Sequence, residues 1–146
     1  MIEQGLFQIL TNESTITALV GAKVYWILAP KGATLPYVIA SRVATEDTHT
    51  VDGAIGLRGG LFQVDCYATD YYTSVAIANA VRKFLGAYRG NLPDTDSTAV
   101  QGVLIEKNWD MPYEEGAKGF VYRQLLEFRV WYAEVPEEIV VDGGGF

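Results

Sequence analysis

Hydrophobic residues recur at helical spacing in two separate parts of the chain. The first part carries Ile2, Leu6, Ile9 and Leu10, which predicts an amphipathic helix at the start of the chain. A short helical turn over residues 15–20 follows, and Gly21 lies where a helix commonly ends. The second long helix is predicted over residues 74–88, because Asp70 or Thr73 can cap its first turn.

Apolar and polar residues alternate in five other segments, which predicts β-strands. These segments are residues 24–27, 35–43, 61–68, 100–109 and 120–133. The predicted order is therefore α-β-β-β-α-β-β. We expect an α+β fold with a mostly antiparallel sheet of four to five strands and two main helices packed on one face.

The last predicted strand, residues 120–133, carries aromatic and aliphatic residues on both of its faces. One face can be covered by the two helices. The other face then needs a cover of its own, and we interpret it as a subunit interface. Trp109, at the end of the preceding strand, is open to the same two interpretations, core or interface.

Two polar, glycine-containing segments separate the strands and are predicted to be loops. Residues 45–60 contain His49, Asp52 and Arg58, and residues 110–119 contain Tyr113 and Glu114. Because long loops without structure of their own usually carry function, we expect both to contact partner proteins.

The end of the chain differs in composition from the rest. We predict a single domain over residues 1–135 and a tail over residues 136–146, which contains Ile139, Val141 and Phe146. A tail with this apolar content is expected to add a strand to its own sheet or to pack on a neighbouring subunit.

The composition is that of a globular protein, with 49% hydrophobic and 20% charged residues. The net charge of −7 and the scattered basic residues argue against direct nucleic-acid binding. An acidic surface suits the lining of a channel through which DNA passes without specific binding. No apolar run reaches the length of a membrane span, and no secretory signal is expected, which favours synthesis in the cytoplasm.

The residues that could carry chemistry do not form a recognisable site. His49 is the single histidine and has no fixed partner, so a catalytic or metal-binding role is disfavoured. Cys66 lies in an alternating apolar segment and is predicted to be a small buried residue. The glycines of residues 56–60 lack the lysine and serine of a phosphate-binding loop. We therefore expect no enzymatic activity, no cofactor and no metal.

Four short patterns recur in a fixed order along the chain. They are TALVG at residues 17–21 before Val24 and Tyr25, APKG at 29–32 before LPYV at 35–38, FQVDCYA at 62–68, and ANAVR at 78–82. Together they resemble the tail-completion family of long-tailed bacteriophages, also called tail-terminator or tail-to-head joining proteins. The resemblance extends from Leu6 to Trp131 and rests on order and pattern rather than on a catalytic signature.

The resemblance implies a structural role in the virion tail, at the interface between head and tail. Members of the family form a ring, commonly of six subunits, that caps the tail tube and docks onto the head-side connector or stopper protein. Two alternatives stay open: a small-ligand-binding or regulatory α+β domain, and another phage role such as tube subunit or connector. A concave apolar pocket with converging polar groups would favour the ligand-binding domain.

Overall fold

The computed structural model describes residues 1–50, 53–95, 97–116 and 119–133, with the side chains of residues 45–57 and 112–119 left out of the description. The predicted tail, with Ile139, Val141 and Phe146, lies outside the described residues, and so does Asp52. The chain order is α-α-β-β-β-α-β-β-β.

Three helices follow the apolar spacing seen in the sequence. α1 (Ile2–Asn12) buries Ile2, Leu6, Ile9 and Leu10 as predicted. The short α2 (Ser14–Val20) ends at Gly21, whose φ of 64° suits a residue without a Cβ atom. α3 (Tyr71–Gly86) begins three residues earlier than predicted, and the Asp70 carboxylate accepts a hydrogen bond from the Thr73 amide at 3.0 Å. This contact confirms the predicted cap.

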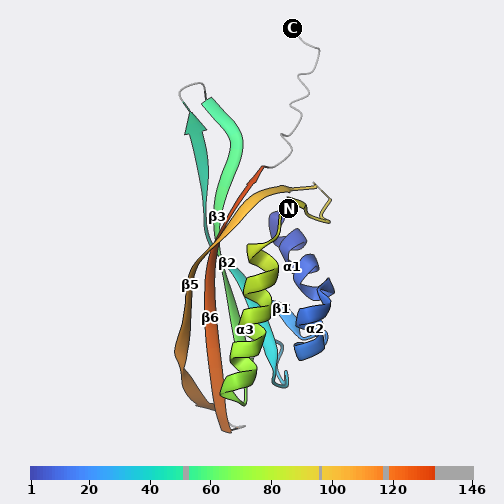
Figure 1. Ribbon diagram of the computed structural model, residues 1–146, viewed down its shortest axis with the longest axis vertical. Helices are drawn as coiled ribbons and strands as arrows, with labels where there is room; N and C mark the ends of the chain where they lie inside the picture. The colour runs from blue at the N-terminus through green and yellow to red at the C-terminus, as the bar shows by residue number, and fades with distance from the viewer. Residues whose placement is uncertain (51–52, 96, 117–118, 134–146) are drawn as a thin grey trace.

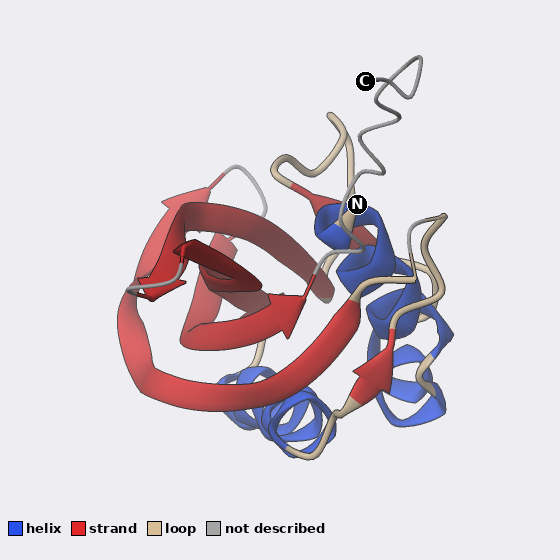
Figure 2. Ribbon diagram, turned by 90° about the horizontal axis from the view of Figure 1, so that it is seen from above, coloured by secondary structure: helices blue, strands red, loops and turns tan. Residues whose placement is uncertain are grey.

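The six strands form one mixed sheet in the order β1-β2-β3-β6-β5-β4. The strands are β1 (Val24–Trp26), β2 (Tyr37–Thr50), β3 (Gly53–Ala68), β4 (Gly90–Asn91), β5 (Ala99–Gly116) and β6 (Gly119–Ala133). All neighbours are antiparallel except the pair β1 and β2. The sheet is strongly curled, and the helices pack on its outer side (Figure 2). The α+β class is confirmed, whereas the predicted number of strands was too low.

Both predicted loops are in fact β-hairpins, and this corrects the sequence analysis. β2 and β3 stay paired out to Thr50 and Gly53, and β5 and β6 out to Gly116 and Gly119. These segments are rich in polar residues and glycine, so no regular alternation of apolar residues reveals them in the sequence; their backbone groups pair with the partner strand instead. Gly60 has a steric role within β3, because a Cβ atom there would lie 2.5 Å from the Phe62 ring.

The core lies between the helices and one face of the sheet. Phe62 on β3 stacks on Phe128 on β6, with ring centroids 6.0 Å apart, and Tyr132 is fully buried nearby. From α3, Ile77 and Val81 belong to the same cluster of buried residues and have no exposed surface. Burial of each such side chain stabilises the fold by roughly 1.5–3 kcal/mol.

The segment after α3 is held against the first helix. Leu92 is buried beside Gly5, where α1 leaves no room for a larger residue. Asp94 accepts hydrogen bonds from the amide and the hydroxyl of Thr98 at 2.8 and 2.6 Å and lies 3.2 Å from the amino group of Met1. The segment that carries Leu92, Asp94 and Thr98 is therefore a fixed part of the domain.

Candidate assembly surfaces

The residues expected to contact partners are divided between two ends of the molecule. The hairpin of β2 and β3 lies at one end, and the hairpin of β5 and β6 lies at the other (Figure 1). Because the four strands are long and antiparallel, their turns must lie at opposite ends of the sheet. The predicted contact residues therefore cannot form one site.

The first hairpin carries His49 and Arg58. His49 lies opposite Ala54 in the backbone register, near the turn. Arg58 lies opposite Asp47 on one side and Tyr132 on the other, and it is half-buried. Arg58 is thus part of the sheet, whereas the sequence pattern predicts that it lies in a loop.

The second hairpin carries Trp109, Tyr113 and Glu114. Trp109 lies opposite Leu125, and its side chain is 40% exposed. The Lys107 ammonium lies 5.0 Å from the centroid of the Trp109 ring, within range of a cation–π interaction. Glu114 pairs with Val121 in the register, and Tyr113 falls at a register shift in β5. An exposed tryptophan on an edge strand is typical of a protein-binding surface.

The sheet face opposite the helices carries a polar network that the sequence did not predict. The Arg123 guanidinium donates to the Asp65 carboxylate at 3.0 Å and lies 5.5 Å from the centroid of the Tyr67 ring. The Gln63 amide donates to the same carboxylate at 3.1 Å. Arg123 is 58 residues away from Asp65 in the sequence, so only the pairing of β3 with β6 brings them together.

Aromatic side chains extend this network toward the edge of the sheet. The ring of Tyr37 lies 5.1 Å from that of Tyr67 and 5.9 Å from that of Tyr25, measured between centroids. Three neighbouring strands thus carry one row of half-buried tyrosines. Tyrosine and arginine are enriched where proteins bind one another.

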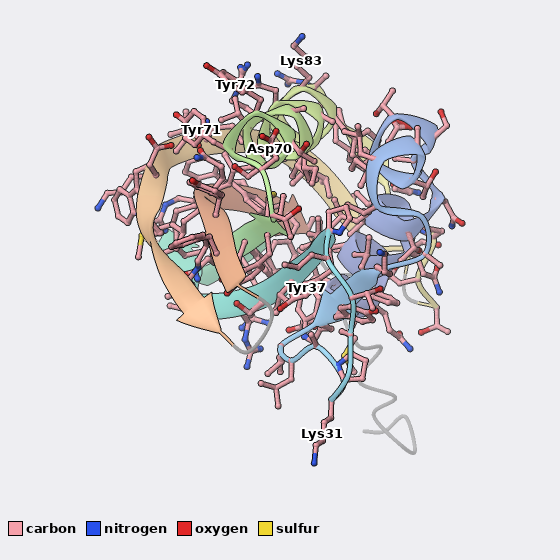
Figure 3. All side chains as sticks on the ribbon, turned by 90° about the horizontal axis from the view of Figure 1, so that it is seen from below. Lys31, Tyr37, Asp70, Tyr71, Tyr72 and Lys83 are labelled. Atoms are coloured by element: carbon pink, nitrogen blue, oxygen red, sulfur yellow. The ribbon has the colours of Figure 1, made fainter. Side chains whose placement is uncertain are left out.

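A second tyrosine cluster lies at the beginning of α3, where Figure 3 shows Asp70, Tyr71 and Tyr72 close together. The Tyr71 hydroxyl donates to the Asp110 carboxylate at 3.1 Å, and Gln124 also donates to Asp110. The hydrogen bond to this carboxylate raises the pKa of Tyr71. Tyr72 is 78% exposed and packs edge-on against Tyr71. The cluster connects α3 to the hairpin of β5 and β6.

A hollow of about 440 Å³ lies between α2 and α3. Its lining is mainly apolar and includes Ala76, Ala80 and Phe84, with Glu13 and Lys83 also in its wall. It is of the size that a small ligand needs, but only two charged side chains line it. A second hollow of about 360 Å³ shares Glu13 and Phe84 with it.

The titratable residues of the described chain show no arrangement for catalysis by a metal. Within the described residues, no group of three or more His, Cys, Asp and Glu side chains could hold a metal ion. Cys66 is completely buried, and this burial raises the pKa of its thiol, with a further contribution from Asp65. Its predicted place in the core is confirmed. None of the described helices is long and apolar enough to cross a membrane.

The fold and its surfaces define a small α+β protein whose exposed aromatic and charged residues suit contacts with other proteins. The sequence model of the family described as Tail completion protein gp17 matches residues 4–133, and the chain belongs to this family. The resemblance identified from the sequence is thereby confirmed. Membership in this family assigns the protein a structural role in the tail of a phage-type virion.

A solved structure has the same fold. It is a chain from a structure described as the virion of a native gene transfer agent particle, with a TM-score of 0.64 and 23% sequence identity. The match covers 90% of this chain and 94% of that chain. At this level of identity the likeness concerns the fold alone. No curated protein matches the chain.

Proposed function

We propose that this protein closes the phage tail tube as a homo-oligomeric ring of six copies and forms the surface that joins the tail to the head connector. The observation that carries the proposal is the family match over residues 4–133, nearly the whole chain. The fold shared with a chain of a gene transfer agent virion supports the same context. The mechanism is steric capping with complementary interfaces and requires no chemical step.

The two hairpins are proposed to meet different partners. The hairpin of β2 and β3, with His49 and Arg58, contacts either the tail tube or the connector, and Asp52, which lies outside the described residues, is proposed to belong to the same contact. The other hairpin, with Trp109, Tyr113 and Glu114, contacts the remaining one. Support comes from their position at opposite ends of the long strands, as a joining protein between two rings requires (Figure 1).

The tail of residues 136–146 is proposed to pack on a neighbouring subunit. Ile139, Val141 and Phe146 supply the apolar contacts, since burial of their side chains away from water lowers the free energy. A chain truncated after Pro136 should form the ring less readily than the full chain. An unchanged oligomer on a sizing column would contradict this part of the proposal.

DNA is proposed to pass through the ring without specific binding. The net charge of −7 supports this, because an acidic wall repels the phosphate backbone. Binding of the purified ring to double-stranded DNA at low salt would contradict it.

The proposal is tested by the native mass of the purified protein and by negative-stain imaging with and without its tail tubes. A ring, or a monomer that becomes a ring at tube ends, supports the terminator role. Self-assembly into long tubes would instead indicate a tube subunit, and binding to the connector alone would indicate a head-side role. A strict monomer that ignores tubes and is stabilised by a small ligand would indicate a ligand-binding domain.

A further inference from the structure

The two outer edges of the sheet are covered only in part. β1 covers β2 as far as Ala40, and no described strand pairs with the outer edge of residues 41–50. On the opposite edge, β4 covers β5 only at Ala99 and Val100. No described strand pairs with the outer edge of residues 101–116. Unpaired backbone groups along a strand are a template for pairing with another chain.

The uncovered parts of the two edges lie at the same level of the sheet. The register connects most residues of β2, across β3 and β6, to a residue of β5, and we refer to such a set as a cross-strand row. One row is Ser41, Gln63, Glu127 and Lys107, and another is Glu46, Gly59, Trp131 and Gly102. Residues 41–46 of β2 and residues 102–107 of β5 therefore end the same rows. We call these two segments the open windows.

One row inside the windows has a large apolar residue at its β5 end and another large apolar residue next to its β2 end. This row is Ala44, Leu61, Arg129 and Leu104. Val43, next to Ala44, and Leu104 are both 52% exposed. An edge that is protected from pairing usually presents charges and not large aliphatic side chains. Each window also carries exposed charged residues, Arg42 in β2 and Glu106 and Lys107 in β5. Val43 and Leu104 are the exposed apolar surface that a partner strand would cover.

We propose that the open window of β5 in one copy pairs with the open window of β2 in the next copy. The sheet then continues from subunit to subunit. This inference rests on the ring proposed above and specifies its contact between subunits. It brings Leu104 of one copy beside Val43 of the next, so that each covers the apolar surface of the other.

The strand directions agree with this contact. The four long strands alternate in direction, so β2 and β5 run in opposite directions. When copies are related by rotation about an axis along the strands, β5 meets the next β2 in an antiparallel pair, as within the subunit. Such a head-to-tail contact uses two different surfaces and can close into a ring. The helices, which pack on the outer side of the curled sheet, remain outside the closed structure (Figure 2).

Each window also contains one register shift, between Arg42 and Ala44 in β2 and between Ile105 and Lys107 in β5. Bulges of this kind disturb the regular ladder and prevent pairing with an arbitrary strand. The two shifts lie in neighbouring intervals, between the rows of Arg42 and Ala44 in β2 and between the rows of Arg42 and Ser41 in β5. A partner strand must accommodate these shifts.

The test uses the full chain and a charge exchange across the contact. Val43→Lys alone and Leu104→Glu alone should each weaken the ring, because a charge then faces an apolar partner. We expect the protein concentration for half assembly to rise by about tenfold or more, as measured by native mass spectrometry. The double variant Val43→Lys with Leu104→Glu should restore the ring. Since these residues lie on opposite edges of one chain, with β3 and β6 between them, the new pair can form only between copies.

Leu28→Lys is the matched control, because Leu28 is an apolar side chain outside the windows and is 76% exposed. This variant should leave the ring intact, and circular dichroism should show every variant folded. If both single variants still form the ring, or if the double variant stays dissociated, the proposed contact is wrong and the terminator role still stands. If the wild-type protein forms no ring even on tail tubes, the proposed contact and the terminator role are both wrong.

Discussion

The Arg123 guanidinium on β6 donates to the Asp65 carboxylate on β3 at 3.0 Å, on the sheet face opposite the helices. The two residues are diagonal neighbours, because Arg123 pairs with Tyr67 in the register and Asp65 pairs with Leu125. Asp65 is 6% exposed, and its carboxylate is paired with this cation and with the amide of Gln63. The ion pair fastens together the two central strands of the sheet.

Replacement of Arg123 by Gln should therefore lower the free energy of unfolding by about 1–3 kcal/mol, because a buried carboxylate loses its charged partner. Urea unfolding followed by circular dichroism measures the change. Lys83→Gln is the control, since Lys83 is exposed on α3, and it should change stability by less than about 0.5 kcal/mol. Equal effects of the two changes would show that the ion pair contributes nothing.

Two helical glycines should respond in opposite ways to alanine. A Cβ atom on Gly5 would lie 2.6 Å from the Cβ atom of Leu92, so Gly5→Ala must push the buried segment away from α1. We expect a net loss of about 1–3 kcal/mol despite the better helix propensity of alanine. On Gly86, the nearest atom to the new Cβ lies 4.0 Å away on Ile105, an ordinary contact.

Gly86→Ala in α3 should therefore leave stability unchanged or raise it by up to about 1 kcal/mol. Thermal unfolding of both variants provides the measurement. Stabilisation by Gly5→Ala would mean that α1 and the segment of Leu92 do not pack as described.

Local patterns predicted the elements that have one buried face. The spacing of Ile2, Leu6 and Ile9 indicated α1 because helical burial imposes that period. Asp70 indicated the beginning of α3 because its carboxylate satisfies an amide of the first turn. In both cases the physical cause lies within a few residues of sequence.

The outer parts of the hairpins could not be predicted in the same way. Residues 45–50 pair with β3 although all six are polar residues, so the cause of the strand lies in its partner. The ion pair of Arg123 with Asp65 depends on the sheet order and has no local signal.

Cys66 should be unreactive in the folded protein. It has no exposed surface, and burial raises the pKa of its thiol, so the reactive thiolate is scarce at neutral pH. We expect its reaction with a thiol reagent such as DTNB at pH 8 to be at least about 100-fold slower in buffer than in denaturant. Equally fast labelling in both would place the thiol at the surface. Cys66→Ser, which lacks a thiol, gives the background signal.

Asp94 should make stability depend on pH in the acid range. Burial alone would raise the pKa of Asp94, but hydrogen bonds from Thr98 and the charge of the terminal amine outweigh it and lower the pKa below the ordinary 3.8. Because the folded state binds the proton more weakly than the unfolded state, the carboxylate stabilises the fold above about pH 4. This stabilisation is lost as the pH falls through the lowered pKa of the folded state.

Urea unfolding between pH 2.5 and 7 tests this dependence, with Asp94→Asn and Thr98→Val compared to wild type. The stability difference between wild type and Asp94→Asn should be largest near neutral pH and shrink below about pH 4, as the carboxylate of the wild type becomes protonated. Thr98→Val should show an intermediate dependence, since it removes the hydroxyl donor and keeps the amide donor. A difference that stays constant down to pH 2.5 would show that the Asp94 charge does not stabilise the fold.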